Sequence, residues 1–591
     1  MIVRGRTAVA ALIGVLVLVE GGCGAGRHGG VGRRSAAPAG IMGSHPLPVW
    51  AQTLERDCVV PAISGARLRV ATRTLRARGC RLDGVGHRYS RKLTPGRVLA
   101  QRPTLDTELP RRGGVNVVVS RGPRPPDIES CRVRPRHYRT QPSFGHVAFC
   151  VARGPDAASS PQEKILVTPR RETPWSTNDD AAMIVSSTGR LLWYLPSLHP
   201  VHDLKTVRYR GRTLLALYRR RRHRGSFYEL RDRRYRVVRR IRMGGHFGTD
   251  MHDLQITPAG TAYLSGYHPV WRPGIGRVTD YVLRELDLRS GRVLFEWHSL
   301  RHVPVSASYL PLPPAGHSWD YFHGNSIQPP VAGDRTIIVS SRNTSAVYGI
   351  DRATGRLRWT LGGKRNQFRI VGGRPPHRFC AQHDVRRLPN GDLMMFDNGG
   401  TGRTAGTGCP IHRARVLELR LQPAARTARV VRTISSRGGG GTGRPLFPIA
   451  LGSDRREPDR TMLIDWGTTG RITEVTPAGR VRLSLRLPGS TYRAVTARWV
   501  GRPAGRPILT AARRPGGTVD AWASWNGATE IKRWQLLGGR APGRLHAVGR
   551  PVAFADLETR MHARTAARLV AVRALDARGR ALGRSKAVLV R

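Results

Sequence analysis

The chain has 591 residues, more than one ordinary hydrophobic core supports, so we expect several folded units. Its 100 Lys and Arg residues exceed its 39 Asp and Glu residues by 61, and only six of the basic residues are Lys. An arginine-rich coding bias carried on solvated faces, attraction to an anionic cell envelope and nucleic-acid binding are three explanations of this charge. Because the arginines are spread along the whole chain and accompany no nucleic-acid-binding motif, we predict no nucleic-acid partner.

The N-terminus has the layout of a secretory signal. Arg4 and Arg6 precede an apolar stretch at residues 8–19, which is too short to span a bilayer comfortably. A small residue before Cys23 indicates a lipoprotein signal at residues 1–23, with simple cleavage and an uncleaved anchor as alternatives. We therefore expect an exported, extracytoplasmic protein of the cell envelope, with membrane anchoring by lipid on Cys23.

Six cysteines remain when Cys23 is set aside, and an even number is typical of disulfides in an oxidising compartment. They fall in pairs that are close in sequence, and we expect three disulfides: Cys58–Cys80, Cys131–Cys150 and Cys380–Cys409. No CxxC pair occurs, so we expect no structural zinc site. We also expect no cofactor.

A flexible linker rich in Gly, Ala, Ser and Arg is expected at residues 24–54, and a small module follows at 55–123. One face of its predicted helix carries Leu68, Ala71 and Leu75. The segment PGRVLAQRP at 95–103 and a closing strand at 115–119 complete the order. This order resembles the PASTA domain, a small α+β module of bacterial envelope proteins. The resemblance implies either contact with peptidoglycan or a spacer role.

One phrase recurs from about residue 180 to 500: apolar residues, a short polar stretch, Gly, then another apolar strand. The clearest copies are VSSTGRLLWYL at 185, ITPAGTAYLSG at 256, LDLRSGRVLFEW at 286, IDRATGRLRWTL at 350, LPNGDLMMFD at 388 and VTPAGRVRLSL at 475. Each copy predicts a β-hairpin, because the turn residues supply positive φ. The copies lie about 30 residues apart, which favours a mostly β protein with a propeller of five to seven blades over a β-sandwich.

Polar residues where predicted strands begin or end are the candidates for chemistry. These residues are His252, His323, Asn325, Arg342 and His383. Any one of them alone has an ordinary explanation, such as a capped turn or a solvated side chain. Together they recur in successive repeats, as residues of neighbouring inner strands in a propeller would.

The runs around these residues resemble the arylsulfotransferase family. They are WDYFHGNS at 319–326, SSRNTSAVY at 340–348, QHD at 382–384 and ASWNGATE at 523–530. The resemblance covers roughly residues 165–591 and implies a six-bladed β-propeller. The implied reaction transfers a sulfuryl group from an aryl sulfate ester to a phenolic acceptor, without a nucleotide sulfate donor.

By resemblance, His383 matches the histidine that is transiently sulfurylated, while Arg342, His323, Asn325 and His252 match the residues that hold the sulfuryl oxygens. Arginine offers paired donors to an oxyanion, and a neutral imidazole is a competent nucleophile. Asp384 either orients His383 or caps a turn. Cys380 is either a metal ligand or, in our preferred interpretation, part of a disulfide that braces the loop.

We place the propeller at residues 124–504 and a C-terminal β-rich domain at 505–591, either a fibronectin-like sandwich or strands that complete the last blade. Its tryptophans are expected in a core rather than as a sugar platform: Trp522, Trp525 and Trp534.

Sulfotransfer is the leading function. A non-catalytic, envelope-tethered propeller that binds anionic glycans or other anions is the second. A quinone-dependent dehydrogenase is the third, because residues 351–359 resemble the tryptophan-docking repeat of those propellers, although only one good copy occurs.

Overall fold

The computed structural model describes residues 58–88, 90, 92–120, 131–145, 147–154, 163–170, 180–221, 225–373, 378–400, 413–440 and 445–590. The predicted signal peptide, with Cys23, and the predicted linker lie outside the described residues. The chain divides into two compact units, Met1–Gly122 and Pro123–Arg591. Among the helices of the described ranges, none combines the length and apolarity needed to cross a membrane.

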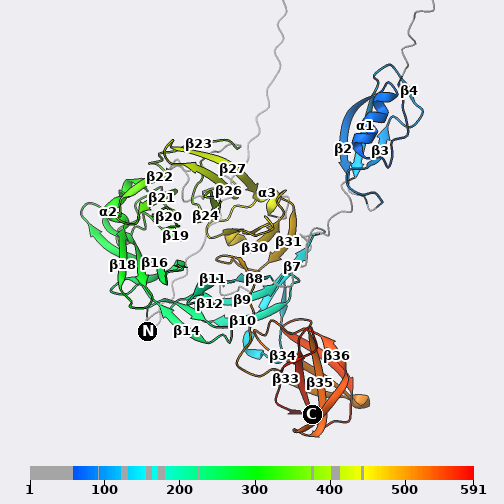
Figure 1. Ribbon diagram of the computed structural model, residues 1–591, viewed down its shortest axis with the longest axis vertical. Helices are drawn as coiled ribbons and strands as arrows, with labels where there is room; N and C mark the ends of the chain where they lie inside the picture. Colours follow the sequence, from blue (N-terminus) through cyan, green and yellow to red (C-terminus); the bar gives the residue numbers. More distant parts are fainter. Residues whose placement is uncertain are drawn as a thin grey trace, which may run out of the picture. The chain divides into compact units, whose positions relative to one another are not determined.

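The described residues of the first unit form one helix and five short strands (Figure 1). They are β1 (Cys58–Val59), α1 (Leu68–Ala77), β2 (Arg81–Arg88), β3 (Val98–Arg102), β4 (Glu108–Leu109) and β5 (Gly114–Ser120). The predicted helix is confirmed: Ala71 and Leu75 are buried, and Leu68 packs against the same core. β5 lies between β2, its parallel partner, and β3, its antiparallel partner. The predicted Cys58–Cys80 disulfide is formed, whereas the PASTA assignment stays a prediction.

The second unit begins with six antiparallel or largely antiparallel sheets, which follow one another around a ring within the described residues (Figure 1). The first three sheets consist of β8 (Lys164–Val167), β9 (Asp180–Ser186), β10 (Leu191–Ser197) and β32 (Val495–Ala497); β11 (Val201–Tyr209), β12 (Arg212–Arg219), β13 (Phe227–Arg231) and β14 (Val237–Ile241); and β15 (Gly248–Ile256), β16 (Thr261–Arg272), β17 (Gly276–Asp287) and β18 (Val293–His298).

The other three sheets consist of β19 (Gly324–Gln328), β20 (Thr336–Ser341), β21 (Ala346–Asp351) and β22 (Leu357–Gly362); β23 (Arg369–Val371), β24 (His383–Arg387), β25 (Leu393–Asp397), β26 (Arg415–Gln422) and β27 (Thr427–Ser435); and β6 (Arg134–Arg136), β7 (Val147–Arg153), β28 (Ser453–Arg456), β29 (Met462–Asp465), β30 (Arg471–Val475) and β31 (Val481–Arg486). Two one-turn helices, α2 (Ser299–His302) and α3 (Ser436–Gly439), interrupt the connections.

The ring is closed by strands that are distant in sequence. β32 pairs with β8, and β31 pairs with β7, so the beginning and the end of this region share two sheets. The Cys131–Cys150 disulfide links the segment before β6 to β7. Closure of this kind ties the beginning of the ring to its end through main-chain hydrogen bonds.

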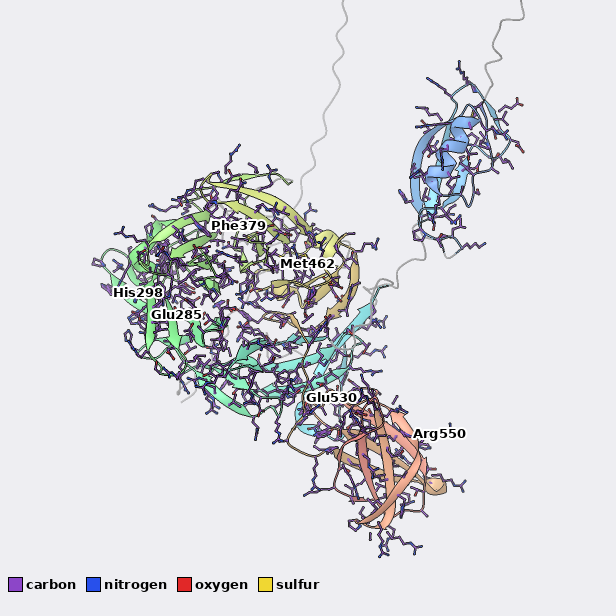
Figure 2. The ribbon with its side chains drawn as sticks, in the orientation of Figure 1. Glu285, His298, Phe379, Met462, Glu530 and Arg550 are labelled. Carbon is purple, nitrogen blue, oxygen red and sulfur yellow. A yellow bond between two sulfur atoms is a disulfide. The ribbon has the colours of Figure 1, made fainter. Side chains whose placement is uncertain are left out.

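The predicted hairpins are present at all six of the copies named above. Each copy joins two paired strands across a turn in which glycine has positive φ, which costs other residues strain. The six turn residues are Gly189, Gly260, Gly291, Gly355, Gly391 and Gly479. Separate apolar clusters fill the spaces between neighbouring sheets; Phe379 and Met462, labelled in Figure 2, belong to two of them.

The C-terminal region forms two further sheets. They consist of β33 (Ile508–Arg514), β34 (Thr518–Ser524) and β37 (Glu558–Arg564), and of β35 (Arg533–Ala541), β36 (Arg544–Ala553), β38 (Leu569–Leu575), β39 (Ala581–Arg584) and β40 (Val588–Leu589). In the described part of the chain these strands pair only with one another, so the suggestion that they complete the last blade is wrong. β32 instead completes the sheet of β8, β9 and β10, because it pairs with β8 after the chain has passed around the ring.

The C-terminal sheets share a hydrophobic core with the first sheets of the ring. One apolar cluster contains Leu166 and Leu215 of the ring together with Trp499, Val519 and Trp534. Trp534 is fully buried and Trp522 is nearly so, which confirms their expected place in the core. Trp525 is only half-buried, so it differs from the other two.

The innermost strands of the ring are β11, β15, β19, β24, β28 and β32. A buried arginine joins several of them. Arg493, which is separated from β32 by Ala494, is 1 % exposed. Its Nη1 lies 3.1 Å from Asp203 on β11 and 3.4 Å from Asp253 on β15. Its Nε lies 3.2 Å from Asp384 on β24, and its Nη2 donates to the Asn325 carbonyl on β19 at 2.7 Å.

Three more cations surround the same carboxylates. Lys205 lies 2.6 Å from Asp203 and 2.9 Å from Asp253. Arg386 lies 2.8 Å from Asp253 and 2.7 Å from Asp384, which Arg455 also contacts. Burial raises the pKa of Asp253 and of Asp384, but these cations outweigh burial and hold each pKa well below its usual range. Asp253 and Asp384 are therefore ionised and lie among cations.

Replacement of Arg493 by Met should destabilise the propeller strongly, because three buried carboxylates lose a shared counter-charge and Asn325 loses a donor. Removing one partner of a buried ion pair typically costs about 3–5 kcal/mol. The measurement is the shift of the urea midpoint in equilibrium unfolding. The control is Arg580→Met, which removes an exposed arginine paired with Asp576 and should change the midpoint little, because main-chain N–H groups still donate to that aspartate. Equal midpoints for the two variants would contradict the central role of Arg493.

Candidate functional site

The structure brings the three predicted histidines together at the inner strands. The ring centroid of His252 lies 4.8 Å from that of His323 and 6.1 Å from that of His383. Tyr492, which precedes Arg493, lies among them, with its ring 6.0 Å from His252 and 5.6 Å from His383. Its hydroxyl donates to the His252 carbonyl at 2.7 Å. All three imidazoles are thus part of one cluster.

Irregular strand pairing explains why these side chains leave the ordinary alternation of a sheet. The register of β15 shifts between Thr249 and Leu254, and that of β24 shifts between His383 and Arg386. β19 has a comparable shift directly after His323, whose own φ is +53°. Such bulges bend the strand and redirect the side chains beside them.

His383 has a defined tautomer. Its Nδ1 lies 2.6 Å from the Gly452 carbonyl oxygen, which can only accept, so Nδ1 carries the proton and donates. Nε2 therefore holds a lone pair, and it has no hydrogen-bond partner among the described residues although it is buried. Burial, and then the positive charge of Arg493 and the neighbouring His252, hold the pKa of His383 well below its usual range. His383 is a neutral imidazole with an available nitrogen.

Carboxylates orient the other two histidines. Nδ1 of His252 lies 2.9 and 3.0 Å from the two oxygens of Asp250, and Nδ1 of His323 is hydrogen-bonded to Asp320. Because a carboxylate accepts, each Nδ1 carries a proton, and each Nε2 is left for the site. Burial raises the pKa of Asp320, but His323 and His252 outweigh it, so the pKa is lowered and the group is a carboxylate.

Asn325 is buried beside His383. Its amide nitrogen donates to the Gln382 carbonyl at 2.8 Å, so it braces the chain directly before His383. Its amide oxygen has no hydrogen-bond partner among the residues described. Gln382 is itself held by Ser340, Ser341 and Ala346, each at 3.0 Å from its side-chain nitrogen. The start of β24 is therefore fixed from the side of β19 and β20.

Arg342 lies at the end of β20 and is half-buried. Its main-chain N–H donates to the His323 carbonyl at 2.9 Å, which makes the two residues neighbours. Its guanidinium donates to the Asn343 side chain and to the Ile449 carbonyl, each at 2.9 Å. The structure thus ties Arg342 to the histidine cluster through the backbone of His323.

Two of the alternatives from the sequence are now decided. Asp384 neither orients His383 nor merely caps a turn, because its carboxylate is engaged by Arg386, Arg455 and Arg493. Its φ of +56° turns its side chain toward these cations while the preceding imidazole enters the site. Cys380 is disulfide-bonded, so its interpretation as a metal ligand is wrong. Cys409, its predicted partner, lies outside the described residues.

Several residues of the cluster were not predicted. Asp250, Asp320, Tyr267 and Tyr492 surround the histidines, and burial raises the pKa of both tyrosines, so both are neutral phenols. A sequence signal was present: the motif His-Asp-Leu or His-Asp-Val occurs at 202–204, 252–254 and 383–385. In each copy the aspartate contacts Arg493.

His202, in the first copy of this motif, is also close to the cluster. It is buried, and its ring lies 5.2 Å from that of Tyr492. Neither ring nitrogen has a hydrogen-bond partner within the described ranges. Burial, followed by the charges of Arg170 and His252, holds its pKa well below the usual range. It is a second neutral histidine on the far side of Tyr492.

The His383 imidazole should remain neutral well below pH 6.5, because protonation would add a charge beside Arg493 without solvent. NMR of protein labelled with ¹⁵N-histidine measures this directly, and a His383→Gln variant assigns the resonance. The control is His298, which should titrate above its usual pKa, because hydrogen bonds to Asp280 and then Glu296 outweigh its burial. A midpoint near 6.5 for His383 would contradict the proposed environment.

Comparison with known proteins supports one family. The family model of arylsulfotransferase (ASST) matches residues 229–487, a range that contains His252, His323, Asn325, Arg342 and His383. No curated protein matches the chain.

Solved structures with similarity to the chain include a Bacteroides caccae protein of unknown function, with 15 % identity, a TM-score of 0.36 and coverage of 57 % of this chain and 99 % of that one. Hydrazine synthase of Kuenenia stuttgartiensis has 12 % identity and a TM-score of 0.28, covering 50 % and 70 %. At these TM-scores the similarity carries no argument. The sequence of the central region, residues 229–487, matches the arylsulfotransferase family.

Proposed function

We propose that this protein is an aryl-sulfate sulfotransferase built on a six-bladed β-propeller. It moves a sulfuryl group from an aryl sulfate ester to a phenolic acceptor through a sulfohistidine at His383, without a nucleotide sulfate donor. The observation that carries the proposal is the state of His383: a neutral ring, Nδ1–H bound to the Gly452 carbonyl, and a lone pair on buried Nε2. The family match over residues 229–487 supports the same reaction class.

In the first half-reaction, the Nε2 lone pair of His383 forms a bond to sulfur while the bond between sulfur and the aryl oxygen breaks. The phenolate leaves with the electron pair of that bond. The ring of the sulfohistidine then carries positive charge, which its Nδ1–H shares with the Gly452 carbonyl. In the second half-reaction, a phenolate oxygen attacks sulfur, and the pair of the S–N bond returns to Nε2.

Charge on the sulfuryl oxygens requires fixed donors. In their imidazolium forms, His252 and His323 donate Nδ1–H to Asp250 and Asp320 and have Nε2–H for a sulfuryl oxygen. Arg342, next to His323, supplies a planar cationic donor of the kind that suits oxyanions. Asn325 braces the chain at His383 and has a second amide hydrogen for an oxygen.

Placement in the cell is a separate proposal. We infer from the signal-like N-terminus that the protein is exported and lipid-anchored at Cys23 on the cell envelope. Residues 55–123 would act there as a PASTA module that contacts peptidoglycan or serves as a spacer. The helix of this module and its Cys58–Cys80 disulfide are compatible with that proposal.

His383→Asn should abolish release of phenol from 4-nitrophenyl sulfate, even without an acceptor, because no nucleophile remains. His252→Asn and His323→Asn should each slow the reaction roughly 10²- to 10³-fold without removing the covalent step. Wild-type protein quenched during turnover should show one added SO₃ on the peptide that contains His383 by mass spectrometry.

The control for these variants is His546→Asn, which replaces an exposed histidine of the C-terminal sheets and should retain full activity. Full activity of His383→Asn, or a label on His252 or His323, would overturn the assignment. Binding of an aryl sulfate or another anion without any turnover would favour the non-catalytic binder.

Arg342→Lys should lose most of the turnover although the charge is conserved, because lysine lacks the planar fork that donates to Asn343 and Ile449 and to an oxyanion. Steady-state kcat/KM with the same donor measures the loss. Arg289→Lys, at an exposed turn between β17 and β18, is the matched control and should behave as wild type. Wild-type rates for Arg342→Lys would exclude it from the oxyanion site.

A further inference from the structure

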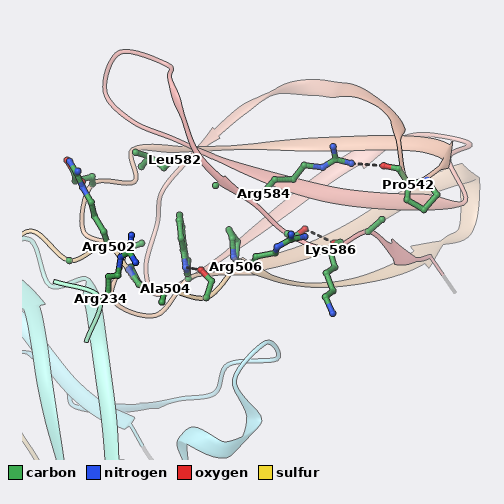
Figure 3. Close-up of a pocket in the computed structure, with 18 residues that line it drawn as sticks. Arg234, Arg502, Ala504, Arg506, Pro542, Leu582, Arg584 and Lys586 are labelled. Carbon is green, nitrogen blue, oxygen red and sulfur yellow. Dashed lines mark hydrogen bonds and ion pairs between the residues drawn. The ribbon is translucent and has the colours of Figure 1, made fainter. Parts of the chain in front are cut away.

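A cavity of about 1000 Å³ lies apart from the histidine cluster, in the second unit. Three parts of the chain form it: the turn between β13 and β14, the segment 501–507, and the C-terminal sheets (Figure 3). None of the residues assigned above to sulfotransfer lines it. Pockets that form where two folded layers meet are common binding sites for small and extended ligands.

The cavity is strongly basic. Five cationic side chains line it, against a single carboxylate, Glu530. The cations are Arg234, Arg502, Arg506, Arg584 and Lys586. Arg502 pairs with Glu530 at 2.5 Å, and Arg584 donates to the Pro542 carbonyl at 2.8 Å. For the other three cations, no side-chain partner is present within the described residues. The lining therefore carries an excess of four positive charges.

This excess contrasts with two arginines close in sequence to the cavity residues, which are paired. Arg236 and Arg580, on neighbouring turns, each have an aspartate partner within 3 Å. Figure 3 shows the cavity cations in succession: Arg234 and Arg502 near one end, Arg506 between, and Arg584 and Lys586 toward the other. A single sulfate cannot engage cations spread in this way, whereas a chain with repeated negative groups can.

An aromatic wall accompanies the cations. Trp525 is half-buried, and its indole N–H donates to the Gly505 carbonyl at 2.8 Å, which holds the ring in place. Gly583 permits the ring to lie there, because a Cβ at this position would come within 2.6 Å of the indole. Leu582 adds a further apolar surface. The ring is thus a fixed part of the cavity wall.

We propose that this cavity binds an acidic oligosaccharide, with sugar rings against Trp525 and the anionic groups paired with the cations. Arginine forks pair well with carboxylates and sulfate esters. Among the described residues, Trp525 is the one aromatic ring that lines the cavity, whereas single-stranded nucleic acid is usually held by several rings that stack successive bases. The proposal does not depend on the sulfotransfer reaction, because the two sites share no residue.

Isothermal titration calorimetry with a heparin-derived hexasaccharide tests the proposal on the whole protein. Arg506→Gln combined with Lys586→Gln should weaken binding at least tenfold, and Trp525→Ala should weaken it at 0.1 M and at 0.3 M salt. The matched control combines Arg550→Gln with Arg564→Gln, which removes two exposed charges outside the cavity and should change affinity less than threefold (Arg550 is labelled in Figure 2).

A hyaluronan hexasaccharide, which has carboxylates but no sulfate esters, distinguishes carboxylate recognition from sulfate recognition. Whether or not hyaluronan binds, the proposal is supported if heparin binding depends on the cavity residues. Equal loss in the cavity and control pairs would overturn the proposal, because binding would then follow overall charge. Equally tight binding of maltohexaose, or of an oligothymidylate with the same dependence on Trp525, would also overturn it. His383→Asn should bind the hexasaccharide normally, so failure of sulfotransfer and failure of this proposal are distinguishable.

Discussion

The buried guanidinium of Arg493 is the contact on which the centre of the ring depends. It meets Asp203, Asp253 and Asp384 and the Asn325 carbonyl, and these four residues belong to four different inner strands. A fully buried charge is tolerated only when it is paired and hydrogen-bonded, so each of the four strands must occupy its place at once. The ring is therefore locked at its axis by charge, as well as by the apolar clusters between its sheets.

The same contact sets the chemistry of the site. In each His-Asp pair the aspartate turns to Arg493, and the histidine before it turns to the opposite side of the strand, as at Asp203 and Asp384 with φ of +53° and +56°. The charge of Arg493 then acts back on His383 and contributes to its lowered pKa. One cation thereby assembles the inner strands and keeps the candidate nucleophile in its neutral form, which is the form that can attack sulfur.

The arginine-rich composition is used in two opposite ways. At the axis, buried aspartates pair with Arg386, Arg455 and Arg493. The charge of these arginines is therefore neutralised within the fold. In the cavity beside the C-terminal sheets, Arg234, Arg506 and Lys586 line a wall that has one carboxylate among the residues the structure describes. The net charge of +61 is thus a poor guide to binding. The local balance of charges distinguishes an arginine that is paired within the fold from one that can pair with an anionic ligand.

The sequence alone determined the features that depend on near neighbours. Glycine turns between alternating apolar strands predicted the hairpins, and His252, His323 and His383 were recognised at strand ends. Only the tertiary structure decided what these side chains contact. Asp384 was assigned to His383 or to a turn, but it pairs with Arg493, 109 positions away, and Arg493 meets Asp203 across 290 positions. The cavity likewise joins Arg234 to residues beyond 500. Such partners are set by closure of the ring and by packing of the C-terminal sheets, which no local pattern encodes.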